Sequence, residues 1–269
     1  MGKRELTRAE EQTLMLIRRN FYRKLDSIDP LMNRQFDVAM NRIIEEVYSP
    51  EKEKYELDTS KGKIRQIYLF MRDQMQDIIK RLVEDGKQTA RIIATSQLKL
   101  TGHEPFDVEE FLGMNDKYGS GLLTRLSMRS IAVIKQLEIL MQVAAMNGYD
   151  KRETFLMYQE TKDNLEDREE VKDAIISGVL ALKDIRKKPH YWLRLVVEDT
   201  TLRGYATANK HYWQRAGGKI IVAEKDGHVC ENCQALDGMV FLPHEDVIPV
   251  HPSCRCIEVP FVGGNGVII

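Results

Sequence analysis

The sequence predicts a mainly α-helical protein, in which an elongated helical N-terminal region precedes a small C-terminal α+β module with short strands and a Cys/His cluster. Apolar residues recur at helical spacing along most of the 269-residue chain, and β-branched runs appear only after Gly217-Gly218. All four cysteines lie between residues 230 and 256. We therefore divide the chain into a helical region at 1–149, a C-terminal domain at 150–260 and a flexible tail at 261–269.

Capping signals bound the first two predicted helices. Residues 7–26 carry apolar side chains three or four positions apart, and Thr7 with Glu10 forms a capping box. Asp29-Pro30 then supplies an N-cap and a first-turn proline for a second helix that ends near Tyr48. The polar residues 51–62 follow as a predicted linker.

Two long helices complete the N-terminal region. The first covers residues 63–100, and Gly86 is expected to weaken or divide it. The second covers residues 122–147 and stops at Asn147-Gly148. Their methionines are predicted to lie in a helix-bundle core. These residues are Met71, Met75, Met141 and Met146.

The C-terminal domain mixes helices with the only predicted strands. Helices are expected at residues 154–161, at 167–188 before Pro189, and from Trp192 to Ala216. Strands are expected at 219–224, 239–241 and 257–259, with a turn at Asp226-Gly227.

Charge and hydropathy restrict the class of protein. The formal net charge of −1 excludes a polycationic nucleic-acid binder, so any contact with DNA must be local. No apolar stretch approaches the roughly twenty residues that cross a bilayer, and the N-terminal residues do not resemble a signal peptide. We expect a soluble, intracellular protein with no membrane partner.

The cysteine-rich segment is a candidate zinc site. A Cys-x-x-Cys pair chelates a metal, and a His/Cys group roughly fifteen to twenty residues later can close a tetrahedron. Five candidate ligands are available for a site that normally takes four, and we expect Cys256 to be the one that does not bind. If Cys254-Arg255-Cys256 is extended, both sulfurs point to one face of the strand, so geometry excludes neither. The alternative is disulfides or free thiols; disulfides require an oxidising compartment. The candidate ligands are Cys230, Cys233, His251, Cys254 and Cys256.

Two further motifs have a structural and a functional interpretation. Leu236-Asp237-Gly238 is predicted to be a hairpin turn, in which Asp237 bonds its own backbone and Gly238 has positive φ, rather than an acidic site. Arg255 is expected to be a surface or carboxylate-paired residue; contact with a nucleic-acid phosphate is the alternative.

Residues 192–259 resemble the phage Mu protein F-like domain of minor head, or head morphogenesis, proteins of tailed bacteriophages. The resemblance depends on several motifs in a fixed order along the chain. They are Glu198-Asp199-Thr200-Thr201, Ala208-Asn209, the glycine break and strand at 217–223, Asp226-Gly227-His228-Val229-Cys230-Glu231-Asn232-Cys233, Leu236-Asp237-Gly238 and His251-Pro252-Ser253-Cys254-Arg255-Cys256.

This resemblance implies a minor head (capsid) protein that acts in head morphogenesis at or near the portal, and in genome packaging or delivery. Its partners would be the portal protein, the scaffold or the major capsid protein. It would be made in the host bacterial cytoplasm and located in the virion, in the head interior or at the portal vertex.

The helical region at 1–149 would then serve as a partner-docking arm, and no catalytic residues are expected. A DNA-binding protein ejected with the genome is one alternative. A metal-dependent nuclease is the other, but a catalytic zinc keeps an open coordination position, and the thiolates here are numerous enough to close it.

Overall fold

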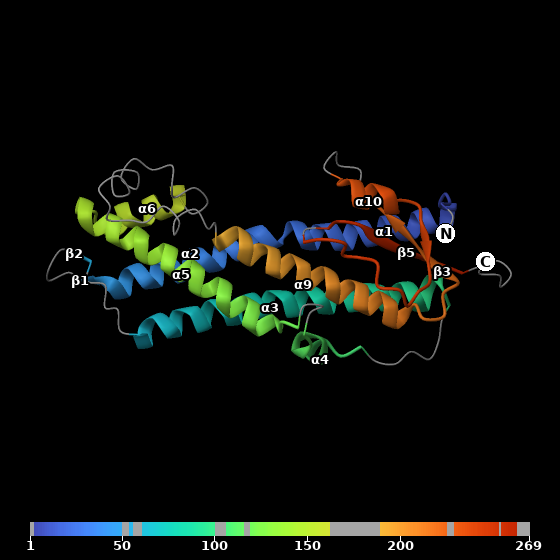
Figure 1. Ribbon diagram of the computed structural model, residues 1–269, viewed down its shortest axis with the longest axis horizontal. Helices are drawn as coiled ribbons and strands as arrows, with labels where there is room; N and C mark the ends of the chain where they lie inside the picture. The colour runs from blue at the N-terminus through green and yellow to red at the C-terminus, as the bar shows by residue number, and fades with distance from the viewer. Residues whose placement is uncertain are drawn as a thin grey trace. The chain divides into compact units, whose positions relative to one another are not determined.

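The computed structural model describes residues 3–49, 54–55, 61–99, 106–115, 119–161, 189–224, 229–252 and 254–262 (Figure 1). The predicted fold class is confirmed, because long helices precede a small sheet with a Cys/His cluster beside it. The predicted helix at 167–188, the Asp226-Gly227 turn and most of the tail at 261–269 lie outside the described residues.

The chain forms two compact units, each assembled from separate segments. The first unit comprises Met1–Ile28, Ile78–Asn115 and Val197–Ile269, and the second comprises Asp29–Asp77 and Asp116–Val196. This grouping does not follow the division at residue 150, because the N-terminal helix and part of the long third helix belong to the same unit as the sheet.

Helix α1 (Arg8–Asp26) begins as the sequence predicts. The Thr7 hydroxyl accepts a hydrogen bond from the Glu10 N–H at 3.4 Å, and the Glu10 carboxylate accepts one from the Thr7 N–H at 2.8 Å. Its predicted apolar stripe is buried. The stripe consists of Leu14, Ile17, Phe21 and Leu25.

The boundaries of helix α2 (Ile28–Val47) correct the prediction. Only Ser27 separates α2 from α1, so Asp29 lies in the first turn of α2 and is not its N-cap. The predicted linker also contains regular structure, because β1 (Tyr48–Ser49) and β2 (Lys54–Tyr55) pair antiparallel with Tyr48 opposite Tyr55.

Helix α3 (Lys61–Ile92) runs without interruption through Gly86 and continues as the π-helical segment η1 (Ile93–Gln97). Of the two predicted effects of Gly86, division of the helix is therefore wrong, and weakening stays a prediction. The glycine instead makes room for an aromatic ring, because a Cβ at this position would lie 2.5 Å from a ring carbon of Tyr205.

We expect Gly86→Ala to destabilise the protein by about 1–2 kcal/mol, because the strain of overpacking outweighs the better helix propensity of alanine. Gly113→Ala is the matched control, since a Cβ at Gly113 would have no neighbour within 4 Å. Urea denaturation of both variants measures the difference. Equal stability of the two variants would show that Tyr205 moves aside without cost.

The second unit has a methionine-rich helical core. Met71, Met75 and Met141 are buried as predicted, whereas Met146 is 57% exposed and corrects the prediction. Helix α5 (Leu122–Asn147) contacts helix α6 (Lys151–Thr161) and ends at Gly148, which adopts a φ of 68°.

Helix α9 (Pro189–Tyr212) starts at Pro189, three residues before the predicted Trp192, because proline suits the first helical position. Its C-terminal part belongs to the first unit, where the indole N–H of the buried Trp213 donates to the Ala90 carbonyl at 3.2 Å. The short helix α4 (Val108–Gly113) belongs to the same unit.

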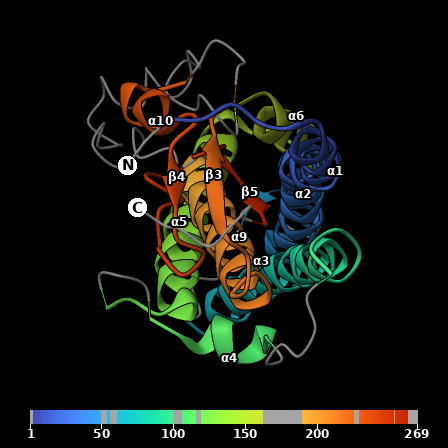
Figure 2. The same cartoon turned by 90° about the vertical axis from the view of Figure 1, so that its right-hand side faces the viewer.

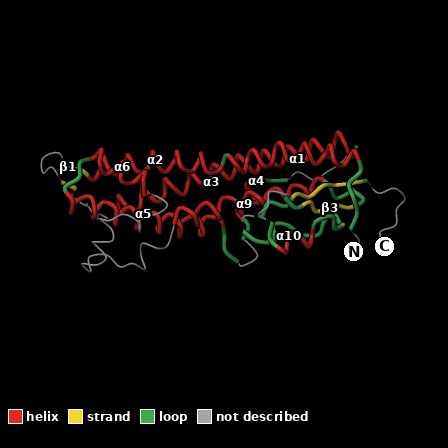
Figure 3. The backbone as a smooth tube through the Cα atoms, turned by 90° about the horizontal axis from the view of Figure 1, so that it is seen from above, coloured by secondary structure: helices red, strands yellow, loops and turns green. Residues whose placement is uncertain are grey.

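The sheet of the first unit has the strand order β4-β3-β5 (Figure 2). The central strand β3 (Gly218–Val222) pairs antiparallel with β4 (Val240–Phe241) and with β5 (Ile257–Phe261). All five residues of β3 are buried. A short helix that the sequence did not predict, α10 (Glu231–Leu236), lies beside the sheet and carries the first cysteine pair (Figure 3).

Within the described part of the chain, no helix combines the length and apolarity needed to cross a membrane.

Candidate metal centre

The first two candidate ligands occupy the start of α10. Cys230 is the N-cap of this helix, and its sulfur accepts a hydrogen bond from the Cys233 N–H at 3.4 Å. Cys233 lies one turn into the helix and is buried. This helical start brings both sulfurs together.

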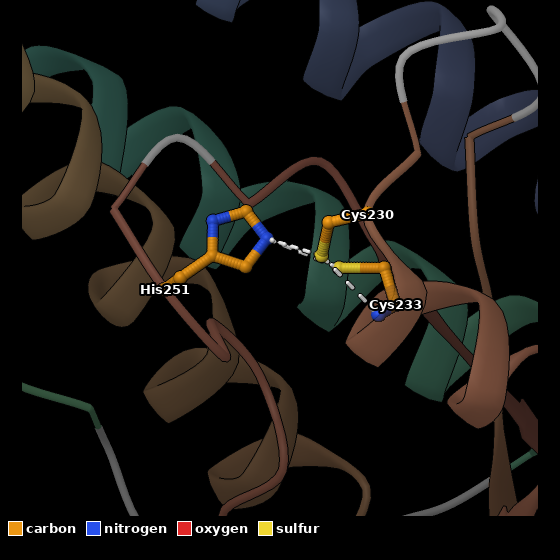
Figure 4. Close-up of side chains that lie close together, drawn as sticks. All are labelled: Cys230, Cys233 and His251. Carbon is orange, nitrogen blue, oxygen red and sulfur yellow. Dashed lines mark hydrogen bonds between the residues drawn. The ribbon is translucent and has the colours of Figure 1, made fainter.

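His251 faces this cysteine pair from the loop that precedes β5 (Figure 4). Its Nε2 lies 3.2 Å from the sulfur of Cys230 and 3.2 Å from that of Cys233. Its Nδ1 lies 2.7 Å from the Pro252 carbonyl oxygen, which can only accept a hydrogen bond. A proton on Nδ1 satisfies this contact, and a neutral ring then presents the lone pair of Nε2 to the sulfurs, as in a histidine that binds a metal.

The remaining two cysteines approach from the segment before β5. The sulfurs of Cys233 and Cys254 are 3.9 Å apart, and the Cys254 N–H donates to the His251 carbonyl at 3.1 Å. The candidate ligands form two triads, each with its ligand atoms within 4.8 Å of one another, and Cys233 belongs to both. The triads are Cys230, Cys233 and His251, and Cys233, Cys254 and Cys256.

These residues fit a metal ion in their chemistry and spacing. Zinc–sulfur bonds of about 2.3 Å and zinc–nitrogen bonds of about 2.0 Å in a tetrahedron place sulfurs about 3.8 Å apart and sulfur about 3.5 Å from nitrogen. The observed separations within the two triads, 3.2 Å for nitrogen to sulfur and 3.9 Å for sulfur to sulfur, lie within a few tenths of an ångström of those values, but Cys254 does not lie within 4.8 Å of all three members of the first triad. A Cys/His cluster that could hold a metal is therefore present.

Hydrogen bonding distinguishes Cys254 from Cys256. A hydrogen bond from the Cys256 thiol, together with backbone N–H groups of Cys256 and Val250, lowers the pKa of Cys254 to about 5, against the effect of burial. The pKa of Cys256 is raised because its thiol donates to Cys254 and because it is buried. These hydrogen bonds favour Cys254 over Cys256 as the thiolate of this pair, and the thiolate is the form that binds metals.

None of the four cysteines forms a disulfide. The 3.9 Å between the sulfurs of Cys233 and Cys254 is almost twice the roughly 2.05 Å of a disulfide bond. The geometry therefore favours shared coordination over disulfide pairing.

The Leu-Asp-Gly sequence connects this cluster to the sheet. Gly238 adopts a φ of 77°, as predicted for a turn. The turn joins α10 to β4 rather than two strands, and the Asp237 carboxylate accepts a hydrogen bond from the Ala223 N–H at 2.9 Å rather than from its own backbone. Asp237 thus fixes the end of α10 to the segment that leaves β3.

We expect Asp237→Ala to destabilise the protein by about 1–2 kcal/mol, because the partly buried Ala223 N–H loses its acceptor. Asp237→Asn keeps a side-chain oxygen at the same position and should lose less. Thermal unfolding of the two variants checks the prediction. A loss as large for asparagine as for alanine would indicate that the negative charge matters more than the hydrogen bond.

Arg255 lies between carboxylates rather than on an open basic surface. Its guanidinium is 2.5 Å from Asp26 and 3.0 Å from Glu224, and it stacks over the ring of Tyr22 with 5.1 Å to the centroid. Two carboxylates offset its charge, so the geometry gives no specific support to a contact with nucleic-acid phosphate.

A buried ion pair lies beside the cluster, and the sequence analysis did not identify it. Lys219 Nζ lies 2.6 Å from Glu258 Oε1, and both side chains are at most 3% exposed. Lys219 also donates to the Glu245 carbonyl at 2.5 Å, and Asn209 donates to Glu258 at 3.3 Å. The only signal in the sequence is a single charged residue within each of two apolar strands.

No protein-family model, curated protein or solved structure matches the chain. The interpretation of the cluster therefore rests on its own residues and geometry.

Proposed function

We propose that the chain is a minor head protein of a tailed bacteriophage, related to the phage Mu protein F-like family, that acts in head morphogenesis at or near the portal. One observation supports this proposal most. The motifs that carry the resemblance, at 230–233, 236–238 and 251–256, are separate in sequence but meet in one small module around Cys233. Motifs in a fixed order that share one module are typical of a family signature rather than of chance composition.

We further propose that the module binds one structural zinc ion through Cys230, Cys233, His251 and Cys254. Cys256 would remain outside the coordination sphere as a hydrogen-bond donor to Cys254. The ligands lie on a six-residue helix and on irregular segments, and a bound zinc ion supplies folding free energy to such segments. Zinc held by three thiolates and one imidazole has no open position for substrate.

The proposed role is therefore assembly rather than catalysis. The helices would contact the portal protein, the scaffold or the major capsid protein, and the module would hold the C-terminal end of the chain in a fixed shape. Genome packaging or delivery would depend on this position within the head.

Co-assembly tests the proposal directly. The full chain is expressed with the portal, scaffold and major capsid proteins of the same phage, and procapsids are isolated by sedimentation. We expect the chain to co-sediment in few copies per particle, and only when the portal protein is present. Particles that contain none of the chain under these conditions would contradict the proposed function.

A further inference from the structure

Helix α1 is attached to the cysteine module at its N-terminal end. The Arg4 N–H donates to the Gly238 carbonyl at 3.0 Å, and Lys3 forms a β-bridge with Met239. Gly238 and Met239 lie directly after α10, the helix that carries Cys233. The Arg4 guanidinium stacks over Phe261 of β5, 4.2 Å from the ring centroid.

The C-terminal end of α1 is attached to the other ligand-bearing segment. Asp26 pairs with Arg255 at 2.5 Å, and the Tyr22 hydroxyl donates to the Arg255 carbonyl at 2.6 Å. Arg255 stands between Cys254 and Cys256, so its backbone position depends on where the sulfurs are held.

Between these ends, α1 packs along β5 (Figure 1). Ile17 and Phe21 of α1 line the same small cavity as Cys254 and Cys256. Other contacts of α1 do not involve the ligand segments: Lys24 pairs with Asp85, and Phe21 packs edge-on against Tyr205.

The ligand segments have little regular structure of their own. α10 has six residues, and residues 254–256 precede β5 as an irregular segment. Helices this short are not stable alone, and a 19-residue helix such as α1 is itself marginal without its packing partners. The segments that attach α1 therefore depend on whatever holds the sulfurs together.

We propose that metal bound at the cysteine cluster holds α1 in place from both ends, and that loss of the metal releases α1 and uncovers its apolar stripe. This inference rests on the proposed metal centre. The stripe consists of Leu14, Ile17, Phe21 and Leu25.

Hydrogen–deuterium exchange on the full chain, loaded with zinc or treated with a chelator, tests this proposal, with bound zinc measured in the same samples. We expect amides of residues 8–26 to exchange about tenfold faster after zinc removal, and amides of α5 in the other unit to be unchanged. Equal exchange of residues 8–26 in both states, with one zinc bound before chelation, would overturn the proposal and leave the metal centre intact. Absence of bound zinc would overturn the metal centre and this inference together.

A variant that keeps every ligand separates release of α1 from unfolding of the chain. Arg255→Gln removes the pairs with Asp26 and Glu224, and we expect it to bind one zinc while residues 18–26 exchange about tenfold faster. Arg19→Gln, an exposed position on the same helix, is the matched control and should show no change. Unchanged exchange in zinc-loaded Arg255→Gln would overturn the attachment at this end, even if chelation unfolds the whole chain.

Discussion

Cys233→Ser is expected to abolish zinc binding and to lower the free energy of unfolding by at least about 4 kcal/mol, which is the stabilisation from a ligand present at a thousand times its dissociation constant. Cys233 is the residue shared by both triads, and it is buried. Serine has no thiolate to bind zinc, and its hydroxyl would be buried at the same position with no metal ion beside it. Urea denaturation in the presence of zinc, with zinc content measured on the same sample, gives both quantities.

Cys256→Ser is the matched control, because the change is chemically identical and the site is equally buried. We expect this variant to retain one zinc per chain and to lose less than about 2 kcal/mol, from the buried hydroxyl and the lost hydrogen bond to Cys254. The opposite pattern, with zinc lost in Cys256→Ser and kept in Cys254→Ser, would exchange the roles that we assign to these two residues.

Lys219→Met is expected to destabilise the protein by about 3–5 kcal/mol, because it leaves the Glu258 carboxylate buried without its cation. Burial raises the pKa of Glu258, opposed by Lys219, so the carboxylate is costly to keep charged when alone. The double variant Lys219→Met with Glu258→Leu should recover most of this loss, since an apolar pair needs no compensation. Denaturation of both single variants and the double variant gives the interaction energy.

An exposed ion pair in the same unit serves as the control for this cycle. Lys210 pairs with Asp246 at 3.1 Å, and these side chains are 40% and 79% exposed, so Lys210→Met should cost less than about 1 kcal/mol. The structure indicates that the two buried charges depend on each other. Additive effects of Lys219→Met and Glu258→Leu on the free energy of unfolding would contradict this.

The sequence predicted the helices well because capping and periodicity are local signals. The Thr7 capping box and the Gly148 stop are examples, since each is encoded within a few residues. The prediction failed where a distant partner decides the outcome. Gly86 resembles a helix breaker in the sequence. In the structure the ring of Tyr205, more than a hundred residues later in the chain, occupies the space that a side chain at position 86 would need.

The ligand residues were also predictable, because metal-binding spacing is visible in the sequence. Their supporting contacts were not. Asp237 bonds Ala223, Arg255 pairs with Asp26 and Glu224, and each of these contacts joins segments that the fold alone brings together. The choice between Cys254 and Cys256 likewise depends on which sulfur receives hydrogen bonds, a property of the folded segment.

The coordination of the bound metal tests the central claim most directly. X-ray absorption at the zinc edge of the purified full chain should show three sulfurs at about 2.3 Å and one nitrogen at about 2.0 Å, with no oxygen ligand. An oxygen in the first coordination sphere would indicate an open site suited to catalysis. That result, or a chain purified with zinc available that contains none, would contradict the closed structural centre proposed for this protein.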